Sequence, residues 1–294
     1  MSKKIGKRVF PWLPIPLKRQ LIYFRLNRRF IPKKPVTFLE KVQWRILHDR
    51  RDLMAVGGDK IAMKEYAQRK SSDVKIPETL WTGTDLNQIS SVDWGCEWVL
   101  KPREGSGSIA FGRGSLSDSG INQKTVQKWR HREAYQVQGM WGYGQSAPGF
   151  LIERRIPTAD GDSPNDIRFF VFGGIVKIIQ IDTPRFSQVQ RRFYTPDWVP
   201  YEVMQGPTIL GPVTSPPKVL SDMIRIAEEI GSDYDFVRID LYDVPDGIYF
   251  GEITPYPTGG NAKFSDNEFD KLLGSWWQLP DIADVKRKNN FETL

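Results

Sequence analysis

The most regular pattern of hydrophobic and polar positions lies at residues 236–254, FVRIDLYDVPDGIYFGEIT. Aliphatic side chains occupy every second position from 237 to 241, which is the period of a half-buried β-strand. The Pro-Asp-Gly sequence at 245–247 is typical of a turn, and the residues after it are of the β-branched and aromatic types that strands favour. The pattern predicts a β-hairpin, whose centre we place at Asp246.

This predicted hairpin sets two carboxylates opposite each other. With the centre at Asp246, Asp240 faces Glu252 and Arg238 faces Thr254. Two directly opposed carboxylates repel by roughly 0.2–1 kcal/mol, so hairpin stability alone does not favour the pair. A divalent cation reverses the sign of the interaction, and Mg²⁺ binds carboxylate oxygens while keeping positions open for water and phosphates. On spacing alone, two solvated acids on an exposed hairpin remain the alternative.

Elsewhere the patterns predict helices mixed with short strands. Helices are expected over residues 37–54, 60–70 and 221–230. Strands are expected over residues 98–100, 149–153 and 166–176, the last of these being a hairpin with a Gly-Gly turn. Asp59 is the predicted N-cap of the second helix. Asp166 and Arg168 share one face of their strand, because side chains alternate.

Two further segments carry residues suited to phosphate binding. Lys60 stands at the start of a predicted helix, where backbone N–H groups favour anions. Lys101 follows a short apolar strand and precedes a Gly/Ser loop, which can surround phosphate oxygens with an ammonium and N–H groups. That loop consists of Gly105, Ser106, Gly107 and Ser108. We expect it to form a hairpin flap; the alternatives are an ordinary surface lysine and a plain flexible hairpin.

Composition limits the class of protein. The chain has 294 residues, 39% hydrophobic and 12% aromatic, which permits a full core and excludes a disordered chain. It has no apolar run long enough to cross a membrane, and we expect no signal peptide. Its single cysteine, Cys96, rules out an intramolecular disulfide and suits a reducing compartment, so we expect a cytoplasmic protein.

The basic charge is concentrated at the N-terminus. Residues 1–34 contain eleven Lys or Arg and no Asp or Glu, so the rest of the chain is net acidic although the whole carries +7. We therefore expect no nucleic-acid partner for the body of the protein. Within residues 16–30, basic side chains mix with aliphatic and aromatic ones, which suits an anionic membrane surface. The alternative is a solubilising arm whose apolar residues dock on the protein's own body.

The motifs occur in an order that resembles the ATP-grasp enzymes. In chain order they are Asp59-Lys60, Val99-Leu100-Lys101-Pro102, Ile152-Glu153, Asp166-x-Arg168, Arg238-x-Asp240 and Glu252-x-Thr254. The segments VRIDLY and YFGEIT are most similar to the TupA-like branch, named for teichuronopeptide biosynthesis. The resemblance covers residues 59–274 and implies an α+β fold, in which two subdomains with antiparallel sheets sandwich ATP.

By motif position, the resemblance implies the following organisation and site residues. The expected segments are a basic, partly helical N-terminal arm at 1–58, an ATP-grasp domain at 59–280 (subdomains 59–152 and 153–280) and a polar tail at 281–294. The residues implied to bind ATP are Lys60, Lys101, Gly105, Ser106, Gly107, Ser108, Glu153 and Asp166. The implied Mg²⁺ ligands are Asp240, Glu252 and Thr254. The implied catalytic residues are Arg168, Arg192 and Arg238.

Within this set, the lysines would contact phosphates, Glu153 would lie near the adenine and Asp166 near the ribose. Arg168 and Arg192 would face the transferred phosphoryl group. The chain departs from the family pattern at Thr254, where many ATP-grasp enzymes carry Asn as a metal ligand. It also departs at residues 1–58, which do not read as the βαβ domain that commonly leads the fold, so we expect a differently built acceptor site.

The implied activity is carboxylate–amine ligation with ATP and Mg²⁺, through an acylphosphate. It requires no protein nucleophile, which fits a chain with one cysteine and with His48 and His131 outside the motifs. The branch is associated with cell-surface polysaccharides, so the expected substrates are a uronic-acid carboxylate on a capsular or other glycan, which can be lipid-linked, and an amino acid. Three alternatives stay open: a glycan kinase, a non-catalytic glycan- or membrane-binding protein with a relic nucleotide site, and a nucleic-acid binder.

Overall fold

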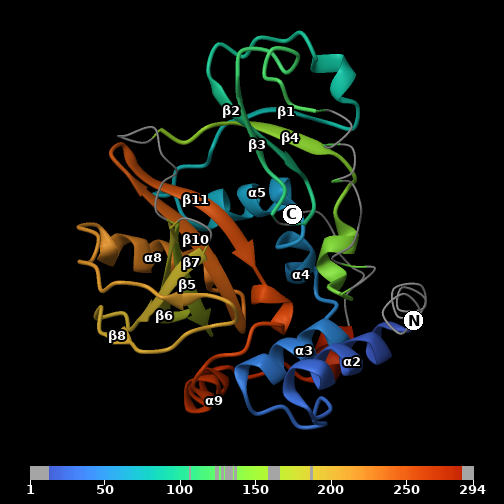
Figure 1. Ribbon diagram of the computed structural model, residues 1–294, viewed down its shortest axis with the longest axis vertical. Coiled ribbons are helices and arrows are strands. Elements are labelled where there is room, and N and C mark those ends of the chain that lie inside the picture. The colour runs from blue at the N-terminus through green and yellow to red at the C-terminus, as the bar shows by residue number, and fades with distance from the viewer. Residues whose placement is uncertain are drawn as a thin grey trace.

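A computed structural model describes residues 13–105, 107–122, 126, 129, 135, 138–157, 166–185 and 188–286. In this part of the chain a small sheet lies above a large one, with α5 near their junction (Figure 1). The helices are α2 (Ile15–Asn27), α3 (Phe38–His48), α4 (Asp52–Val56), α5 (Lys60–Lys70), η2 (Leu86–Ile89), η3 (Trp141–Gln145), α8 (Leu220–Gly231), η4 (Pro257–Gly260), α9 (Asn267–Trp276) and α10 (Ile282–Lys286).

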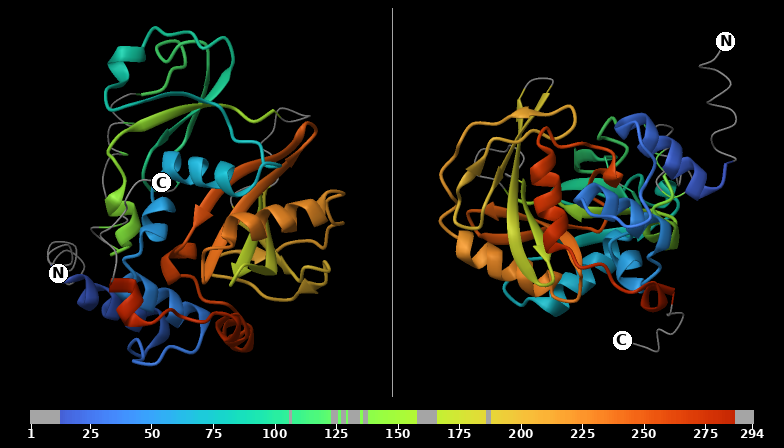
Figure 2. Two further views of the ribbon diagram at one scale, coloured as in Figure 1. Left: turned by 180° about the vertical axis from the view of Figure 1, so that it is seen from behind. Right: turned by 90° about the horizontal axis from the view of Figure 1, so that it is seen from below.

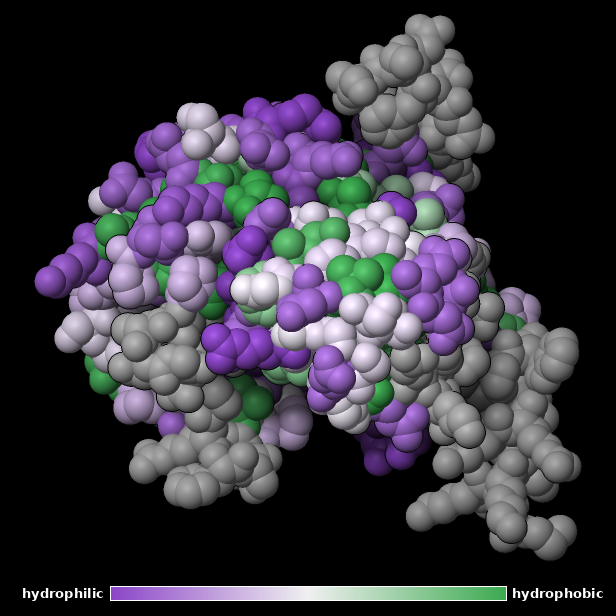
Figure 3. All heavy atoms as spheres, turned by 90° about the horizontal axis from the view of Figure 1, so that it is seen from above, coloured by the Kyte–Doolittle hydropathy of each residue, from purple (hydrophilic) through white to green (hydrophobic). Residues whose placement is uncertain are grey.

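The small sheet has the strand order β1-β4-β2-β3 and is antiparallel throughout. Its strands are β1 (Thr79–Gly83), β2 (Glu97–Pro102), β3 (Ala110–Arg113) and β4 (Phe150–Arg154). Its own hydrophobic core is built around Trp98, Leu100, Phe150, Ile152 and Leu86. Seen from above, the surface of the molecule carries small hydrophobic patches among polar residues (Figure 3).

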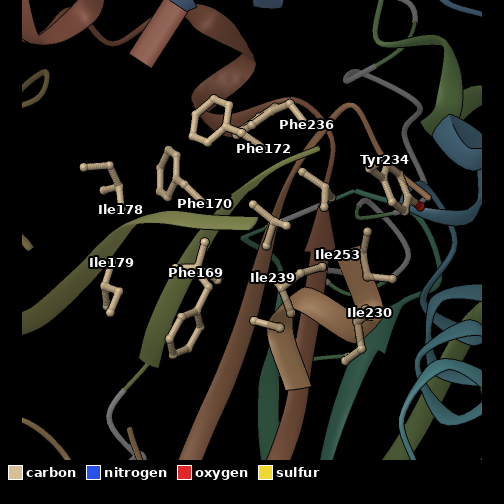
Figure 4. Packing of buried hydrophobic residues seen from close by; sticks show 14 of the residues in the cluster. Phe169, Phe170, Phe172, Ile178, Ile179, Ile230, Tyr234, Phe236, Ile239 and Ile253 are labelled. Atoms are coloured by element: carbon tan, nitrogen blue, oxygen red, sulfur yellow. The ribbon is translucent and has the colours of Figure 1, made fainter. Parts of the chain in front are cut away.

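The large sheet has the order β11-β10-β5-β6-β7-β8, with β9 paired in parallel to β7. Its strands are β5 (Asp166–Phe172), β6 (Ile175–Arg185), β7 (Gln188–Tyr194), β8 (Pro200–Tyr201), β9 (Ile209–Leu210), β10 (Phe236–Val244) and β11 (Gly247–Thr254). Helix α8 packs against β10, β5 and β6, and α3 packs on the other face through Phe38, whose ring lies 4.9 Å from that of Phe236. Figure 4 shows Phe170, Phe172 and Phe236 on one side of the strands, with Ile239 on the other.

The face packed by α3 changes from aromatic to charged along its strands. On β10 it carries Phe236 and then Arg238 and Asp240, and the neighbouring β5 carries Phe170 and then Arg168. The aromatic end joins the hydrophobic core. Phe38 covers only the aromatic end. The polar side chains of this face are therefore concentrated at its charged end.

The segment after α5 ties the two sheets together. The backbone N–H of Lys75 donates to the carbonyl of Ile248 in β11, and the Lys75 carbonyl accepts from the N–H of Phe250, both at 2.8 Å. The chain then enters β1 of the small sheet. Because of this connection, α5 and its first residue, Lys60, are held where the two sheets meet.

The predicted division of the chain differs from the structure at three places. The helix predicted over 37–54 is two helices, since Asp49 takes an extended conformation after α3. The predicted arm at 1–58 includes α3, whose Phe38 belongs to the large-sheet core. The predicted boundary after residue 152 falls inside β4. The polar tail begins with α10, and its remainder, 287–294, lies outside the described residues.

Helix α2 docks on the body of the protein, as the alternative for the arm proposed, but with an unexpected face. Its fully buried side chains include Arg19 and Tyr23, whereas Leu21 and Phe24 are exposed. None of the described helices is long and apolar enough to cross a membrane.

Candidate functional site

The two carboxylates predicted to face each other do so. Asp240 of β10 pairs with Glu252 of β11, and Arg238 pairs with Thr254. Asp240 lies deep in the sheet, with 3% of its surface exposed, whereas Glu252 is half-buried. The register predicted from the hydrophobic alternation is therefore confirmed at the positions that carry the chemistry.

The hairpin reaches this register through a bulge. At its tip Val244 pairs with Gly247, so the centre of the turn lies half a residue before the predicted one. One extra residue, Gly251, is inserted in β11 directly before Glu252, and this restores the predicted pairing with Asp240. A Cβ at Gly251 would lie 2.8 Å from the Asp240 carbonyl oxygen, so the close approach requires glycine.

Arg238 clamps Asp240 from two positions away on the same strand. Its Nε donates to Asp240 Oδ1 at 2.7 Å and its Nη2 to Oδ2 at 2.6 Å. The same Nη2 donates to the Thr254 hydroxyl at 3.1 Å. The bidentate contact fixes the orientation of the Asp240 carboxylate. The structure thus places Thr254 beside Arg238, with its oxygen already engaged.

Glu252, in contrast, has a free carboxylate. Among the residues that the structure describes, none forms a hydrogen bond or an ion pair with it. Its charge still acts on its surroundings: burial raises the pKa of the Tyr143 hydroxyl, and the nearby Glu252 carboxylate raises it further. A half-buried carboxylate with open lone pairs is a ready ligand for a cation.

Arg168 connects three aspartates on neighbouring strands. Its Nε and Nη2 donate to Asp166 Oδ2 at 2.9 and 2.5 Å, and its Nη1 donates to Asp182 Oδ2 at 2.5 Å. Its Nε also lies 3.5 Å from Asp240 Oδ2. Burial and the charge of Asp240 raise the pKa of Asp166 to about 6, although Arg168 opposes them. Asp166 Oδ1 is buried with no hydrogen-bond partner in the described part of the chain.

Arg192, predicted as a catalytic residue, lies on the opposite face of the sheet. Its Nε donates to the Gly211 carbonyl at 2.7 Å and its Nη1 to Glu202 at 2.6 Å. Its neighbour Arg191 faces the other way and donates to both oxygens of Asp182, at 2.7 and 2.5 Å. Adjacent residues of a strand point to opposite faces, so only Arg191 joins Arg168. The structure therefore brings Arg191 together with the other predicted site residues, and it places the predicted Arg192 apart from them.

The start of α5 is fixed by Asp59, the predicted N-cap. Its Oδ1 accepts from the backbone N–H of Ile61 at 2.8 Å. Its Oδ2 accepts from Arg103 Nη2 at 2.7 Å and from the Ser146 hydroxyl at 2.9 Å. Arg103 follows β2 and Ser146 precedes β4, so the cap also ties α5 to the small sheet. The position of Lys60, the next residue, is therefore set by both.

Lys60 reaches the predicted flap loop. Its Nζ donates to the Gly105 carbonyl at 2.5 Å. Gly105 and Gly107 have φ of +79° and +82°, a left-handed conformation that side-chain-bearing residues rarely adopt. Ser108 is half-buried in the same loop, and Ser106 lies outside the described residues. The loop is thus held next to Lys60 in the free protein.

Glu153 lies between two lysines at the edge of this loop. It forms a salt bridge with Lys101 through Oε1, and Lys64 Nζ lies 2.6 Å from Oε2. Burial alone would raise the pKa of Glu153, but the two ammonium groups hold it below its ordinary value. The structure therefore places Glu153, implied to lie near the adenine, in contact with an implied phosphate-binding lysine.

These contacts define two groups of side chains. The lysine cluster consists of Lys60, Lys64, Lys101 and Glu153. The carboxylate cluster consists of Asp166, Asp182, Asp240, Glu252, Arg168, Arg191 and Arg238. They meet at Lys60: burial lowers its pKa to about 8, the charge of Glu252 opposes this, and Lys101 reinforces it. Lys60 is thus within electrostatic reach of both sheets.

The carboxylate cluster fits a hard divalent cation. In the described part of the chain no three His, Cys, Asp or Glu side chains come close enough to enclose a metal by themselves. Mg²⁺ needs no such cage, because it takes one or two carboxylates together with substrate phosphates and water. The free carboxylate of Glu252 and the opposed carboxylate of Asp240 would supply those ligands. The unpartnered Oδ1 of Asp166 is an independent sign that positive charge is lacking there.

Sequence reasoning missed Lys64, Asp182 and Arg191. Lys64 lies four residues after Lys60 on α5, so helical periodicity could have placed both on one face. Asp182 pairs with Asp166 only because the register shifts by one residue between Phe170 and Val171, so the Gly-Gly turn alone would have placed Ile181 opposite Asp166. Arg191 had no such signal, because nothing in the local sequence tells its face from that of Arg192.

The amino-acid sequence matches the TupA-like ATP-grasp family over residues 40–278. No curated protein matches it. Similar solved structures include D-alanine–D-alanine ligase from Helicobacter pylori, with 13% identity, TM-score 0.43 and coverage of 78% of this chain and 61% of that one. The ADP complex of purK, N5-carboxyaminoimidazole ribonucleotide synthetase, has 11% identity, TM-score 0.42 and coverage of 69% and 46%. This chain therefore spans roughly half the length of these structures.

Proposed function

The chain belongs to the TupA-like ATP-grasp family, and we propose that it catalyses ATP- and Mg²⁺-dependent ligation of a carboxylate to an amine. One observation carries the proposal. Helix α5, which begins at Lys60, packs against β11, the strand of Glu252, and Lys60 Nζ donates to the carbonyl of Gly105 in the loop that follows Lys101. Cationic groups that can bind phosphates therefore meet carboxylates that can bind a metal at one place. Binding of a nucleoside triphosphate with its metal requires this arrangement.

In this proposal the lysine cluster holds the phosphates. Lys60 and Lys101 are compact ammonium groups, each able to donate charge-assisted hydrogen bonds to phosphate oxygens. A phosphate that approaches competes with the Gly105 carbonyl for Lys60 and with Glu153 for Lys101. Lys64 stays with Glu153 and keeps that carboxylate paired when Lys101 turns to the nucleotide.

The carboxylate cluster holds the metal and the reacting groups. Asp240 and Glu252 would bind Mg²⁺, which when bound neutralises phosphate charge during transfer. Arg238 orients Asp240. Arg168, on the neighbouring strand β5, places its positive charge next to the same Asp240 carboxylate. Fixed guanidinium groups stabilise charge that develops on transferred oxygens without having to reorganise.

The chemistry consists of two displacements. An oxygen of the substrate carboxylate attacks the γ-phosphorus, the bond to the β,γ-bridging oxygen breaks, and ADP leaves with that electron pair. The amine nitrogen then attacks the acyl carbon, phosphate leaves with the C–O electron pair, and the nitrogen loses a proton to water. Positioning and electrostatics suffice for both steps, and no protein nucleophile takes part.

We propose a uronic-acid carboxylate of a cell-surface or capsular glycan as the acyl donor and an amino acid as the amine. The membership of the TupA-like branch supports the glycan. The basic arm, which suits an anionic lipid-linked substrate, is consistent with it. We place the enzyme on the cytoplasmic side, where ATP is available.

The test is turnover of Mg-ATP with a matrix of uronic-acid oligosaccharides and amino acids, with ADP, phosphate and product mass recorded together. Wild type should release ADP and phosphate in equal amounts and form a product of amide mass. Glu252→Gln should lower this turnover at least about 100-fold, and substitution of Asp246, an exposed carboxylate at the tip of the same hairpin, by Asn should leave it unchanged. A product heavier by a phosphoryl group would identify a kinase. Absence of nucleotide binding would leave a non-catalytic binding protein.

A further inference from the structure

Helix α2 is attached to the protein through its charged face. Arg19 is completely buried, and its Nη2 donates to the Gly259 carbonyl at 2.7 Å while its Nε donates to Gln43 at 2.9 Å. Lys18 and Tyr23 are also buried. A buried guanidinium with these partners is strongly held, because its removal would leave them unsatisfied. The helix cannot rotate about its axis without breaking these bonds.

This attachment turns the apolar side chains of α2 outward. Leu17, Leu21 and Phe24 follow one another at four- and three-residue spacings, so they form one stripe along the helix. Their exposed fractions are 46%, 41% and 40%, and Phe30, whose ring lies 5.1 Å from that of Phe24, is 63% exposed. A contiguous apolar stripe held in solvent is unfavourable unless something covers it.

The stripe is surrounded by positive charge. Arg25 and Arg28 are exposed at the end of the helix, and Lys33 and Lys34 are exposed in the loop that follows. The sequence contains no Asp or Glu before residue 35. An apolar stripe bordered by cations is complementary to a bilayer surface with anionic headgroups.

We propose that the outward face of α2, with the loop to Lys34, binds an anionic membrane surface. Leu17, Leu21, Phe24 and Phe30 enter the boundary between headgroups and acyl chains, while the exposed cations lie over the headgroups. A second copy of the chain fits this face less well, because it would bring the same positive charge to meet it. A nucleic acid would use the charges but has no need of the stripe.

The attachment of α2 also brings the proposed membrane-binding face close to the segment that follows the β10–β11 hairpin. Arg19, on the inner side of α2, contacts Gly259 and Asn261, which follow the β11 strand that ends at Thr254. Figures 1 and 2 show α2 at the end of the molecule opposite the small sheet, and the hydrogen bond from Arg19 to Gly259 places it next to η4. A bilayer bound to α2 would therefore lie near the loop that follows β11, the strand that carries Glu252. This step rests on the proposed function and favours a lipid-linked carboxylate substrate.

The experiment measures vesicle binding of the full chain by flotation, without ATP or glycan, so its result is independent of the proposed activity. Vesicles of phosphatidylcholine with about 30% phosphatidylglycerol are compared with phosphatidylcholine alone. The double variant Leu21→Gln/Phe24→Gln should lower binding at least about tenfold, and Lys33→Gln/Lys34→Gln about thirtyfold. The matched control is Val199→Gln/Val213→Gln, whose residues are 58% and 61% exposed elsewhere; it should bind as wild type.

Two results would overturn the inference. The first is equal binding of wild type and Leu21→Gln/Phe24→Gln to anionic vesicles, which would reduce the interaction to general electrostatic attraction. The second is failure of wild type to bind either vesicle. If such a chain formed dimers that the same double variant dissociates, the stripe would belong to an interface between copies. Thermal unfolding of each variant shows whether its fold is intact.

Discussion

The lysine cluster and the carboxylate cluster, which meet at Lys60, carry excess charge of opposite sign. In the lysine cluster, three ammonium groups face the single carboxylate of Glu153. In the carboxylate cluster, four acids face three guanidinium groups, and the acid Glu252 has no partner among the described residues. The first therefore has spare positive charge for phosphates, and the second has spare negative charge for a metal.

The two clusters also differ in the cation they use. Lysine carries a point charge on a flexible stem, so Lys60 and Lys101 can leave their present partners for a ligand. Arginine binds carboxylates through a planar fork, so Arg238, Arg168 and Arg191 fix the orientation of the aspartates. One cluster is therefore organised to exchange partners and the other to stay rigid.

The largest effect is expected at Glu252. Glu252→Gln should lower turnover by about 10²- to 10³-fold, the range for loss of one preorganised electrostatic contact in a transition state. Because Glu252 has no partner to lose in the described structure, the free energy of unfolding should change by less than about 1 kcal/mol. Turnover and urea unfolding check this. If Glu252→Gln were as unstable as Asp240→Asn, the expected difference between the two carboxylates would be contradicted.

Asp240→Asn gives the complementary result. It should lower turnover about as much, but it also removes the counter-charge of the buried Arg238, which costs about 3–5 kcal/mol of stability. Of the two facing carboxylates, one should therefore be needed for both folding and turnover, and the other for turnover alone. Equal stability of the two variants would sink this distinction.

The next effect concerns nucleotide binding without metal. Lys101→Met should weaken metal-free ADP binding by about 10- to 100-fold, since a hydrogen bond to a charged group contributes about 1.5–3 kcal/mol. Glu252→Gln should leave metal-free ADP binding unchanged. Lys75→Met, which removes an exposed lysine bound to Asp246, is the matched control. Calorimetric titration with ADP measures these affinities. Equal losses of affinity in the Lys101 and Glu252 variants would show that the two clusters do not act separately.

A smaller effect separates two adjacent arginines. Arg191→Gln should lower turnover about tenfold, because Asp182 loses its bidentate partner and Arg168 is then less well positioned. Arg192→Gln should keep turnover within about twofold of wild type below its unfolding temperature, since its side chain lies on the other face. Steady-state kinetics of both variants decide the matter. The reverse order would favour Arg192 as the catalytic residue.

The smallest effect is a pH dependence from Lys60. With a pKa near 8 in the free protein, this ammonium loses its proton as pH rises through 8, and phosphates bind the protonated form. ADP affinity should therefore fall about fourfold between roughly pH 7 and 8.5. Lys60→Arg, which stays charged, should remove this dependence. Titrations in which wild type and variant fall in parallel would assign the effect to another group.

The site residues that the sequence could place are those whose neighbours are fixed by local pattern. The alternation around Val237 and Ile239 fixed the face of Asp240, and the turn fixed its partner to within one residue. Even so, the predicted centre was wrong by half a residue, and the pairing holds because the bulge at Gly251 compensates. A bulge of this kind leaves only a glycine as its trace in the sequence.

What the sequence could not place depends on contacts between distant segments. The pairing of Lys64 with Glu153 joins α5 to β4 across 89 positions of chain, and no local period reports it. The orientation of α2 was also out of reach, because a basic helix with apolar residues normally turns its apolar side inward. The hydrogen bonds from Arg19 to Gln43 and the η4 loop reverse that preference.

The proposed ligation requires that a carboxylate is activated by phosphorylation. The most direct measurement uses a uronic-acid oligosaccharide labelled with ¹⁸O in its carboxylates, turned over with Mg-ATP and an amino acid, with the released phosphate analysed by mass spectrometry. Each phosphate released should contain one ¹⁸O atom, because the attacking carboxylate oxygen leaves with phosphorus. Unlabelled phosphate, with both ¹⁸O atoms retained in the sugar, would contradict it.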